Sequence, residues 1–409
     1  MRNHACGLFF VVAYLAIAGT TMGADSLTIR FSDLDDWART RSLAAASIKS
    51  ALELVKAERD IDLQRSNPEL AFDRQDVDDN TETEVTLGKT FEMPWVSIKR
   101  RSAWNERLRA ADFSAEAQRA LLLSELKTGY ATQQLLDAKL SRLTHIRAVL
   151  TDASHVATTR HTEGHLSGVE NHLIQMTVIS LQAEHQRALA ERRDAANHWR
   201  ALLGYPAEQP LTLLTPVDFL PVTLTEVGDY TRRFEERPAY QSRLVYQSAL
   251  AKHAGAERSR FIPFFNLYGG LKTIDPDHDG YVIGVSLSLP LLNSNRAAAR
   301  KFDIERQLAV TESSRYFTEQ VGRINSLLAS IREAQETLSL SKDHFQEDRE
   351  ALDDLLFSYE EGWLTLSELL NAVQIEVAGL GNFYDQMARY YQNIFELEAI
   401  TGATLVTFE

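Results

Sequence analysis

The segment 275–280 has the side-chain types of a divalent-cation site. It reads Asp-Pro-Asp-His-Asp-Gly, which is similar to the first half of a calcium-binding loop. A complete loop would carry a carboxylate at its twelfth position, where this chain has Ser286. Proline, aspartate and glycine also favour tight turns, so we expect this segment to connect two strands without a bound ion.

Four histidines near one glycine form a second set of metal-ligand types: His155, His161, His165 and His172. Ligands on a helix must share one face, and Gly164 interrupts the helical pattern between His161 and His165. We therefore expect solvated histidines here and no metal ion.

The chain lacks the common sequence signatures of catalysis. It contains no nucleophile elbow, no phosphate-binding loop and no dinucleotide-binding glycine motif. Its net charge of −14 disfavours nucleic acid as a partner, because phosphates would be repelled. We predict a non-enzymatic protein that uses no cofactor and binds no nucleic acid.

Residues 1–24 have the pattern of a secretory signal peptide. A basic residue precedes an apolar stretch over 8–18, which is too short to span a bilayer as a helix. Cleavage would also remove Cys6, the only cysteine of the chain. We therefore predict an exported protein without disulfides.

The remaining sequence contains an internal duplication. Pro68 is answered by Pro263, and a Glu-Gly-X-Leu-Ser/Thr motif at 163–167 recurs at 361–365, a shift of 198 residues. Such recurrence indicates two structural repeats. The predicted segments are a first repeat (25–205), a proline-rich connector (206–227), a second repeat (228–405) and a C-terminal tail (406–409).

Apolar periodicity predicts long packed helices. Between Leu366 and Ile394, apolar residues alternate at intervals of four and three over nine positions, which is typical of coiled-coil packing. From Trp95 to Arg160 there is no proline and only one glycine. A helix of that length would reach about 100 Å, which suits a structure that crosses a wide aqueous gap.

Each repeat also contains strand patterns like those of outer-membrane proteins, with apolar side chains alternating with small or polar ones. The apolar positions are Val85, Leu87 and Phe91 in the first repeat and Ile283, Val285, Leu287 and Leu289 in the second. Lys89 interrupts the first row, and partner strands would come from Leu70, Phe72 and residues 264–268. The same alternation also fits an ordinary strand pair on a soluble core.

Four strands in one chain cannot close a membrane barrel, because the smallest outer-membrane barrels have eight. An open sheet would leave its edge groups unpaired in outer-membrane lipid. We therefore predict a homo-oligomer, and three copies would supply twelve strands. The expected fold is mainly α-helical with a small β-barrel contribution, in which duplicated long α-hairpins form a trimeric helical tunnel.

The chain resembles the TolC-like outer-membrane efflux family in four stretches that follow the family's order: Asn67-Pro68-Glu69-Leu70, Arg237-Pro238, 284–291, and Gly362 with 369–372. The resemblance implies a trimer with a 12-stranded barrel in the outer membrane of a Gram-negative bacterium. It also implies a periplasmic helical tunnel that works with a periplasmic adaptor protein and an inner-membrane pump. The Asn-Pro-Glu-Leu stretch is most similar to the CzcC-like branch, which serves heavy-metal efflux.

The resemblance assigns adaptor docking to the turns at the tunnel tip. The matching residues are Gly164, Leu166 and Ser167 in the first repeat, and Gly362, Leu364 and Thr365 in the second. Alternatively, the glycines only provide the backbone geometry of the turns.

The resemblance also assigns a periplasmic aperture to the residues just after these turns. Glu368 and Asn371 match positions that often carry aspartate in the family, and Glu170 is the first-repeat counterpart of Glu368. A ring of carboxylates would attract cations. The same residues also fit a solvated helix face.

We therefore predict a passive exit duct for small molecules or metal ions, driven by an inner-membrane pump. The outer-membrane component of a type I protein secretion system is one alternative. A soluble periplasmic coiled-coil scaffold is an alternative of another class.

Overall fold

The computed structural model describes residues 27–77, 80–206, 210–262, 264–274, 278–287, 295–343, 345 and 351–408. Some predictions fall wholly or partly outside these residues. They are the signal peptide at 1–24, residues 207–209 of the connector, Pro263 of the duplication, residues 275–277 of the calcium-like segment, Leu289 with the rest of 288–291, and the last residue of the tail. The elements of the first half are β1 (Leu27–Ile29), η1 (Phe31–Asp33), α1 (Leu34–Asp36), η2 (Trp37–Arg41), α2 (Leu43–Asp62), β2 (Glu69–Val77), β3 (Asn80–Glu92), α3 (Pro94–Thr162) and α4 (Gly168–Leu203). They are followed by β4 (Leu211–Leu213), α5 (Val227–Glu236), α6 (Pro238–Arg258), β5 (Phe264–Ile274), β6 (Asp279–Leu287), α7 (Arg296–Lys342), α8 (Ala351–Glu360) and α9 (Leu366–Thr401).

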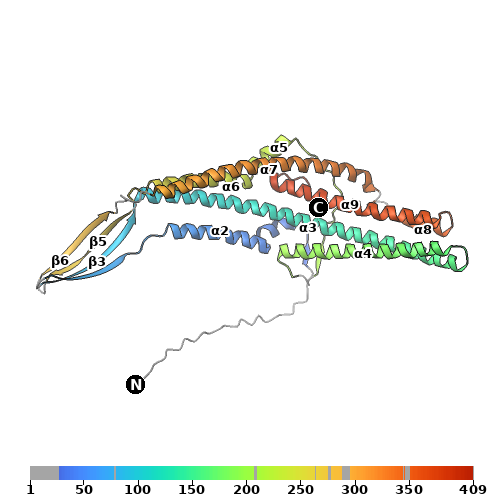
Figure 1. The fold of residues 1–409 in the computed structure, drawn as a ribbon, viewed down its shortest axis with the longest axis horizontal. Coiled ribbons are helices and arrows are strands. Elements are labelled where there is room, and N and C mark those ends of the chain that lie inside the picture. The colour runs from blue at the N-terminus through green and yellow to red at the C-terminus, as the bar shows by residue number, and fades with distance from the viewer. Residues whose placement is uncertain are drawn as a thin grey trace, which may run out of the picture.

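The molecule is elongated, with a sheet at one end and two helix-to-helix turns at the other (Figure 1). The predicted long helix is α3, which has 69 residues and corresponds to about 100 Å. Pro94 occupies its first turn, where the missing N–H costs no hydrogen bond. This helix therefore runs from the base of the sheet to the first turn.

The sheet joins strands from both halves of the chain. Its order is β2-β3-β5-β6 and every neighbouring pair is antiparallel. Residues directly opposite one another share a face. Leu87 is opposite Leu70, and Val85 is opposite both Phe72 and Leu271, so the apolar side chains line up on one face.

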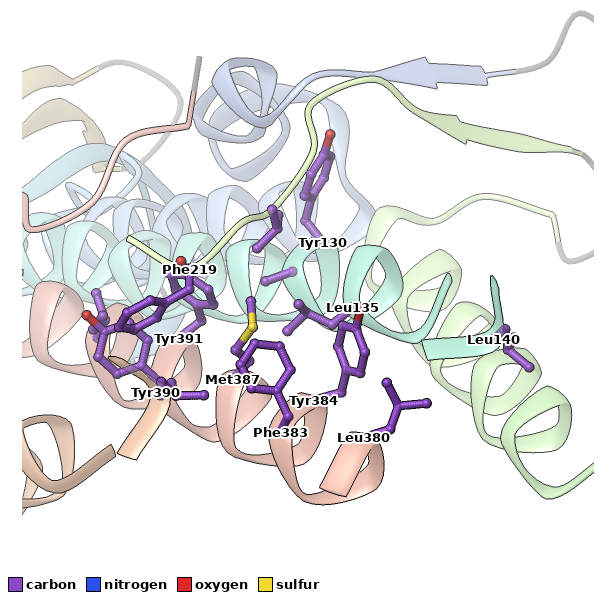
Figure 2. Close-up of a cluster of buried hydrophobic side chains, with 14 of the residues drawn as sticks. Tyr130, Leu135, Leu140, Phe219, Leu380, Phe383, Tyr384, Met387, Tyr390 and Tyr391 are labelled. Carbon is purple, nitrogen blue, oxygen red and sulfur yellow. The ribbon is translucent and has the colours of Figure 1, made fainter. Parts of the chain in front are cut away.

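The core of the helical body lies along the predicted heptad positions of α9. α3 packs against α2, α4, α6 and α9, and α7 packs against α6 and α9. Leu380, Met387 and Tyr391 are buried, and Figure 2 shows the side chains of α9 that face α3 near Leu135. The four-three periodicity thus correctly identified the buried stripe of this helix.

Tyrosine hydroxyls fix the connector on this core. The Tyr130 hydroxyl donates to the carbonyl oxygen of Thr215 at 3.0 Å, and the Tyr390 hydroxyl donates to that of Leu220 at 2.9 Å. Burial raises the pKa of Tyr390 to about 12, so its proton remains available as a donor at neutral pH. Nearby, β4 pairs in parallel with β1, which ties the connector to the start of the described chain.

Candidate functional site

The two turns at the far end of the molecule have the same backbone geometry. Gly164 lies between α3 and α4 with φ of 84°, and Gly362 lies between α8 and α9 with φ of 80°. A Cβ atom at either position would meet no heavy atom within 4 Å. The left-handed backbone is therefore the reason for glycine at both positions, because an added Cβ atom would not clash with the rest of the chain.

Each turn is closed by the same pair of side chains. The Ser167 hydroxyl accepts a hydrogen bond from the Glu170 backbone N–H, and the Glu170 carboxylate accepts from the Ser167 N–H at 3.0 Å. Thr365 and Glu368 repeat this capping box, with a distance of 2.9 Å from the Thr365 N–H to the carboxylate. The Ser167 and Thr365 hydroxyls also donate to these carboxylates, at 2.6 and 2.7 Å. Together with the bonds from the backbone N–H groups, they lower the pKa of both Glu170 and Glu368.

The leucines of the two motifs point toward the core. Leu166 and Leu364 are half-buried and pack against the hydrophobic cluster of the helical body. The residues that precede them, His165 and Trp363, are exposed, and 73% of Trp363 is accessible. Trp363 makes an edge contact with the exposed ring of Phe357 at 5.6 Å. Trp363 and Phe357 therefore contribute exposed apolar surface at the tip, together with Val169 in the first turn of α4. The motif comparison of the two repeats did not identify these residues.

Arg160 connects the two turns and was also missed from the sequence. Its Nη2 donates to the backbone carbonyl oxygens of Tyr359 at 3.2 Å and Glu360 at 2.8 Å. Its own carbonyl oxygen accepts the N–H groups of His165 and Leu166. No sequence pattern pairs Arg160 with residues about 200 positions away, because the contact depends on how the two hairpins pack.

The predicted aperture residues lie in the first turns of α4 and α9. Glu368 and Asn371 are exposed and Glu170 is half-buried. One oxygen of each carboxylate accepts from its capping partner, Ser167 for Glu170 and Thr365 for Glu368. These hydrogen bonds do not neutralise the carboxylates, so both side chains keep their negative charge.

The histidines near the first turn do not converge on one point. His155, His165 and His172 are exposed, while the His161 ring is engaged with the backbone, with 2.9 Å between its Nδ1 and the carbonyl oxygen of Leu166. Within the described ranges, no group of three or more His, Cys, Asp or Glu side chains has the geometry to hold a metal ion.

The sheet at the opposite end presents an exposed apolar face. Val85, Leu87 and Phe91 lie on β3, and Ile283, Val285 and Leu287 lie on β6, as the alternation predicted. Ile283 is 75% accessible and Leu87 is 59% accessible, although both are aliphatic. Exposed apolar rows of this size mark surfaces that another phase or partner covers.

The other face of the sheet is polar, and its outer strands are open. Glu84 and Thr86 share this face with Lys272, whose Nζ lies 2.7 Å from the Glu82 carboxylate. In the described part of the chain, β2 and β6 each pair on one side only. The sheet therefore has two unpaired edges, which favour strand addition.

No helix among the described residues combines the length and apolar composition needed to cross a membrane.

No protein-family model and no curated protein sequence matches this chain. Solved structures do match. The outer-membrane channel CmeC of Campylobacter jejuni has a TM-score of 0.75 and 13% identity, and the match covers 91% of this chain and 85% of that one. The outer-membrane protein VceC of Vibrio cholerae has a TM-score of 0.72 and 16% identity, covering 91% and 96%. CusC has a TM-score of 0.74 and 17% identity, covering 91% and 92%. The chain therefore has the fold of TolC-like outer-membrane efflux channels.

Proposed function

We propose that this chain is the subunit of a trimeric outer-membrane exit duct that works with a periplasmic adaptor and an inner-membrane pump. The observation that carries the proposal is the four-stranded sheet, which is apolar on one face, polar on the other and unpaired at both edges. A sheet of this kind is stable in lipid only when its edges are closed. The same sheet on a soluble scaffold would expose its apolar face to water.

The strand number supports closure by identical copies. Four strands per chain are too few for a membrane barrel, whereas three copies supply twelve. The apolar face, with Leu87 and Ile283, would contact lipid, and the face with Glu84 and Lys272 would line the lumen. The helices would continue this lumen through the periplasm over about 100 Å.

The two turns at the far end are the proposed contact for the adaptor. Gly164 and Gly362 leave open space beside the backbone, so another chain can approach closely. Leu166 and Leu364 would hold the turns in shape from inside, and Trp363 would offer an apolar anchor on the surface. The adaptor would thus recognise the repeated turn geometry together with the exposed Trp363 ring and its neighbour Phe357.

The carboxylates beside the turns are the proposed selectivity element. Three copies of Glu368, with Glu170 and Asn371 nearby, would surround the aperture of a trimer and attract cations. Cargo choice would rest mainly with the pump, and small molecules and metal ions both fit a passive duct. The Asn67-Pro68-Glu69-Leu70 stretch favours heavy-metal export within this class.

Membrane fractionation of the expressed full-length protein tests the proposal. We expect the protein in the outer-membrane fraction, as a species about three times the subunit mass on unboiled gels and as a monomer after boiling. Deletion of the coding region should raise sensitivity to metals or drugs, and restoring it should reverse the change. A water-soluble monomer would contradict the proposal and favour a periplasmic scaffold.

A further inference from the structure

A basic pocket lies where the sheet meets the helical body. It has a volume of about 810 Å³ between the end of α2, the base of β3 and the start of α3. Five cationic side chains and two carboxylates line it, in a chain whose net charge is −14. The cations are Arg65, Lys89, Arg100, Arg101 and Arg260, and the carboxylates are Asp62 and Glu92.

Ion pairs inside the pocket occupy both carboxylates. Arg100 lies 3.0 Å from Asp62 and 2.6 Å from Glu92, and Arg260 lies 3.8 Å from Glu92. In the described ranges, no ion pair includes Arg65, Lys89 or Arg101. The pocket therefore keeps three cations for an anionic ligand.

The position of Lys89 places this charge beside the apolar face of the sheet. Lys89 follows Leu87 by two residues on β3 and is opposite Leu267 on β5, so it belongs to the apolar row. Its ammonium group lies 5.6 Å from the centre of the Phe91 ring. A lysine in such a row is favourable only where its charged end reaches a polar layer or an anion.

Aromatic pairs lie at the same level of the molecule. Phe91 stacks on Phe265 at 5.3 Å, and Trp95, at the start of α3, stacks on Phe261 at 5.7 Å. Trp95 and Phe261 are exposed, and aromatic girdles of this kind mark the boundary between lipid and water. The pocket also borders the first turn of α3 at Pro94 and Ser97, where the helix dipole adds a partial positive charge.

We propose that this pocket binds the phosphate group of an anionic phospholipid in the periplasmic leaflet. The inference rests on the proposed function, because it needs the sheet to lie in the membrane. Lys89 and Arg101 would contact the phosphate, while the acyl chains would lie on the apolar row beside Leu87. The apolar row favours a lipid over a soluble phosphate, since a free anion would gain nothing from it.

Native mass spectrometry of the delipidated full-length protein in detergent tests the site with three probes. These are phosphatidylglycerol, dioleoylglycerol, which lacks phosphate, and glycerol 3-phosphate, which lacks acyl chains. We expect tight binding of phosphatidylglycerol alone. The double variant Lys89→Gln, Arg101→Gln should weaken that binding at least about tenfold, because it removes two charge-assisted hydrogen bonds. The single variant Arg101→Gln, at an exposed helix position, should give a smaller loss in the same direction.

The matched control is Lys99→Gln, Arg109→Gln, which removes the same charge from exposed positions of α3 outside the pocket. It should bind phosphatidylglycerol like the unmodified protein. Equal weakening in both double variants, or equal binding of dioleoylglycerol, would overturn the site. Binding of glycerol 3-phosphate as tight as that of the lipid would overturn the lipid as ligand. An unmodified protein that forms no membrane trimer would instead refute the proposed function.

Discussion

Arg160 and Tyr359 join the two helical hairpins at their tips. The Arg160 guanidinium lies 4.9 Å from the centre of the buried Tyr359 ring, while the same side chain donates to carbonyl oxygens at the end of α8. A cation at a helix C-terminus satisfies carbonyl groups that have no partner within the helix. One side chain from the first repeat thus completes the end of a helix in the second.

Replacing Arg160 should loosen the second tip. In Arg160→Ala, the Glu360 carbonyl oxygen loses its side-chain donor and the Tyr359 carbonyl oxygen keeps only the Gly362 N–H. We expect amide hydrogen exchange over residues 351–366 to accelerate roughly tenfold, equivalent to about 1.4 kcal/mol. Hydrogen-exchange mass spectrometry would measure the change. Arg147→Ala, on the same helix but farther from the turns, should leave that exchange unchanged. Equal exchange in Arg160→Ala and the unmodified protein would refute the role of this contact.

Acid should open the two capping boxes. Hydrogen bonds from Ser167 and Thr365 lower the pKa of Glu170 and Glu368 in the folded chain. A carboxyl whose pKa is lowered by folding contributes stability above its unfolded pKa, and this stability is lost as pH falls through the folded pKa. Protection factors of the turn amides, corrected for intrinsic exchange, should therefore fall between pH 7 and about pH 3.

The variant Glu170→Ala, Glu368→Ala supplies the comparison for the acid effect. Without the carboxylates, the turn amides should have low protection that no longer depends on pH over this range. If the variant retained the acid-dependent loss, other groups would be responsible.

The charge of Glu368 should favour cations in the duct. Glu368→Gln keeps a side chain that can close the capping box, so the turn should persist while the charge disappears. In planar bilayers we expect the ratio of cation to anion permeability to fall by about twofold or more. Glu361→Gln removes an exposed charge from the same turn and serves as control. An unchanged ratio in Glu368→Gln would argue against an aperture at this position.

The space beside Gly362 should matter for the adaptor and not for the fold. Asparagine tolerates the left-handed backbone at a cost of about 1 kcal/mol, and a Cβ here meets no atom of the chain. Gly362→Asn should therefore form trimers but lose export, whereas Gly362→Pro and Gly164→Pro should also distort the turn, because proline cannot adopt this φ. Resistance assays beside unboiled gels would measure both properties.

The control for this substitution is Gly228→Asn in the first turn of α5, where a Cβ is equally unhindered. It should preserve both trimers and export. Full export by Gly362→Asn would show that this turn does not contact an adaptor closely.

The sequence predicted what depends on regular periodicity. The heptad from Leu366 to Ile394 located the buried side of α9, and alternation around Leu87 and Ile283 located β3 and β6. These predictions succeed because each pattern lies within a single helix or strand and needs no knowledge of the rest of the fold.

Contacts between distant segments were not predictable in this way. The apolar run from Leu211 to Leu214 was compatible with a short strand, which is β4. β1 has only three residues, and its parallel pairing with β4 depends on the packing of the whole body. The pairing of Arg160 with α8 has the same origin. The Glu-Gly-X-Leu motif correctly identified the turns, but it did not indicate that Leu166 and Leu364 face inward while Trp363 faces outward.

Disulfide cross-linking between the two sheet edges tests the central claim most directly. Ala71 lies on the polar face of β2, and Val282 and Ser286 lie on the same face of β6. After signal cleavage no native cysteine should remain, so Ala71→Cys can be combined with a cysteine at Gly280, Val282 or Ser286 in turn. Ala71→Cys alone should not cross-link, because β2 would pair with β6 of the neighbour. We predict that at least one combination yields covalent dimers and trimers in membranes, with nothing larger. Monomers in every combination, or a ladder that extends beyond trimers, would contradict the account.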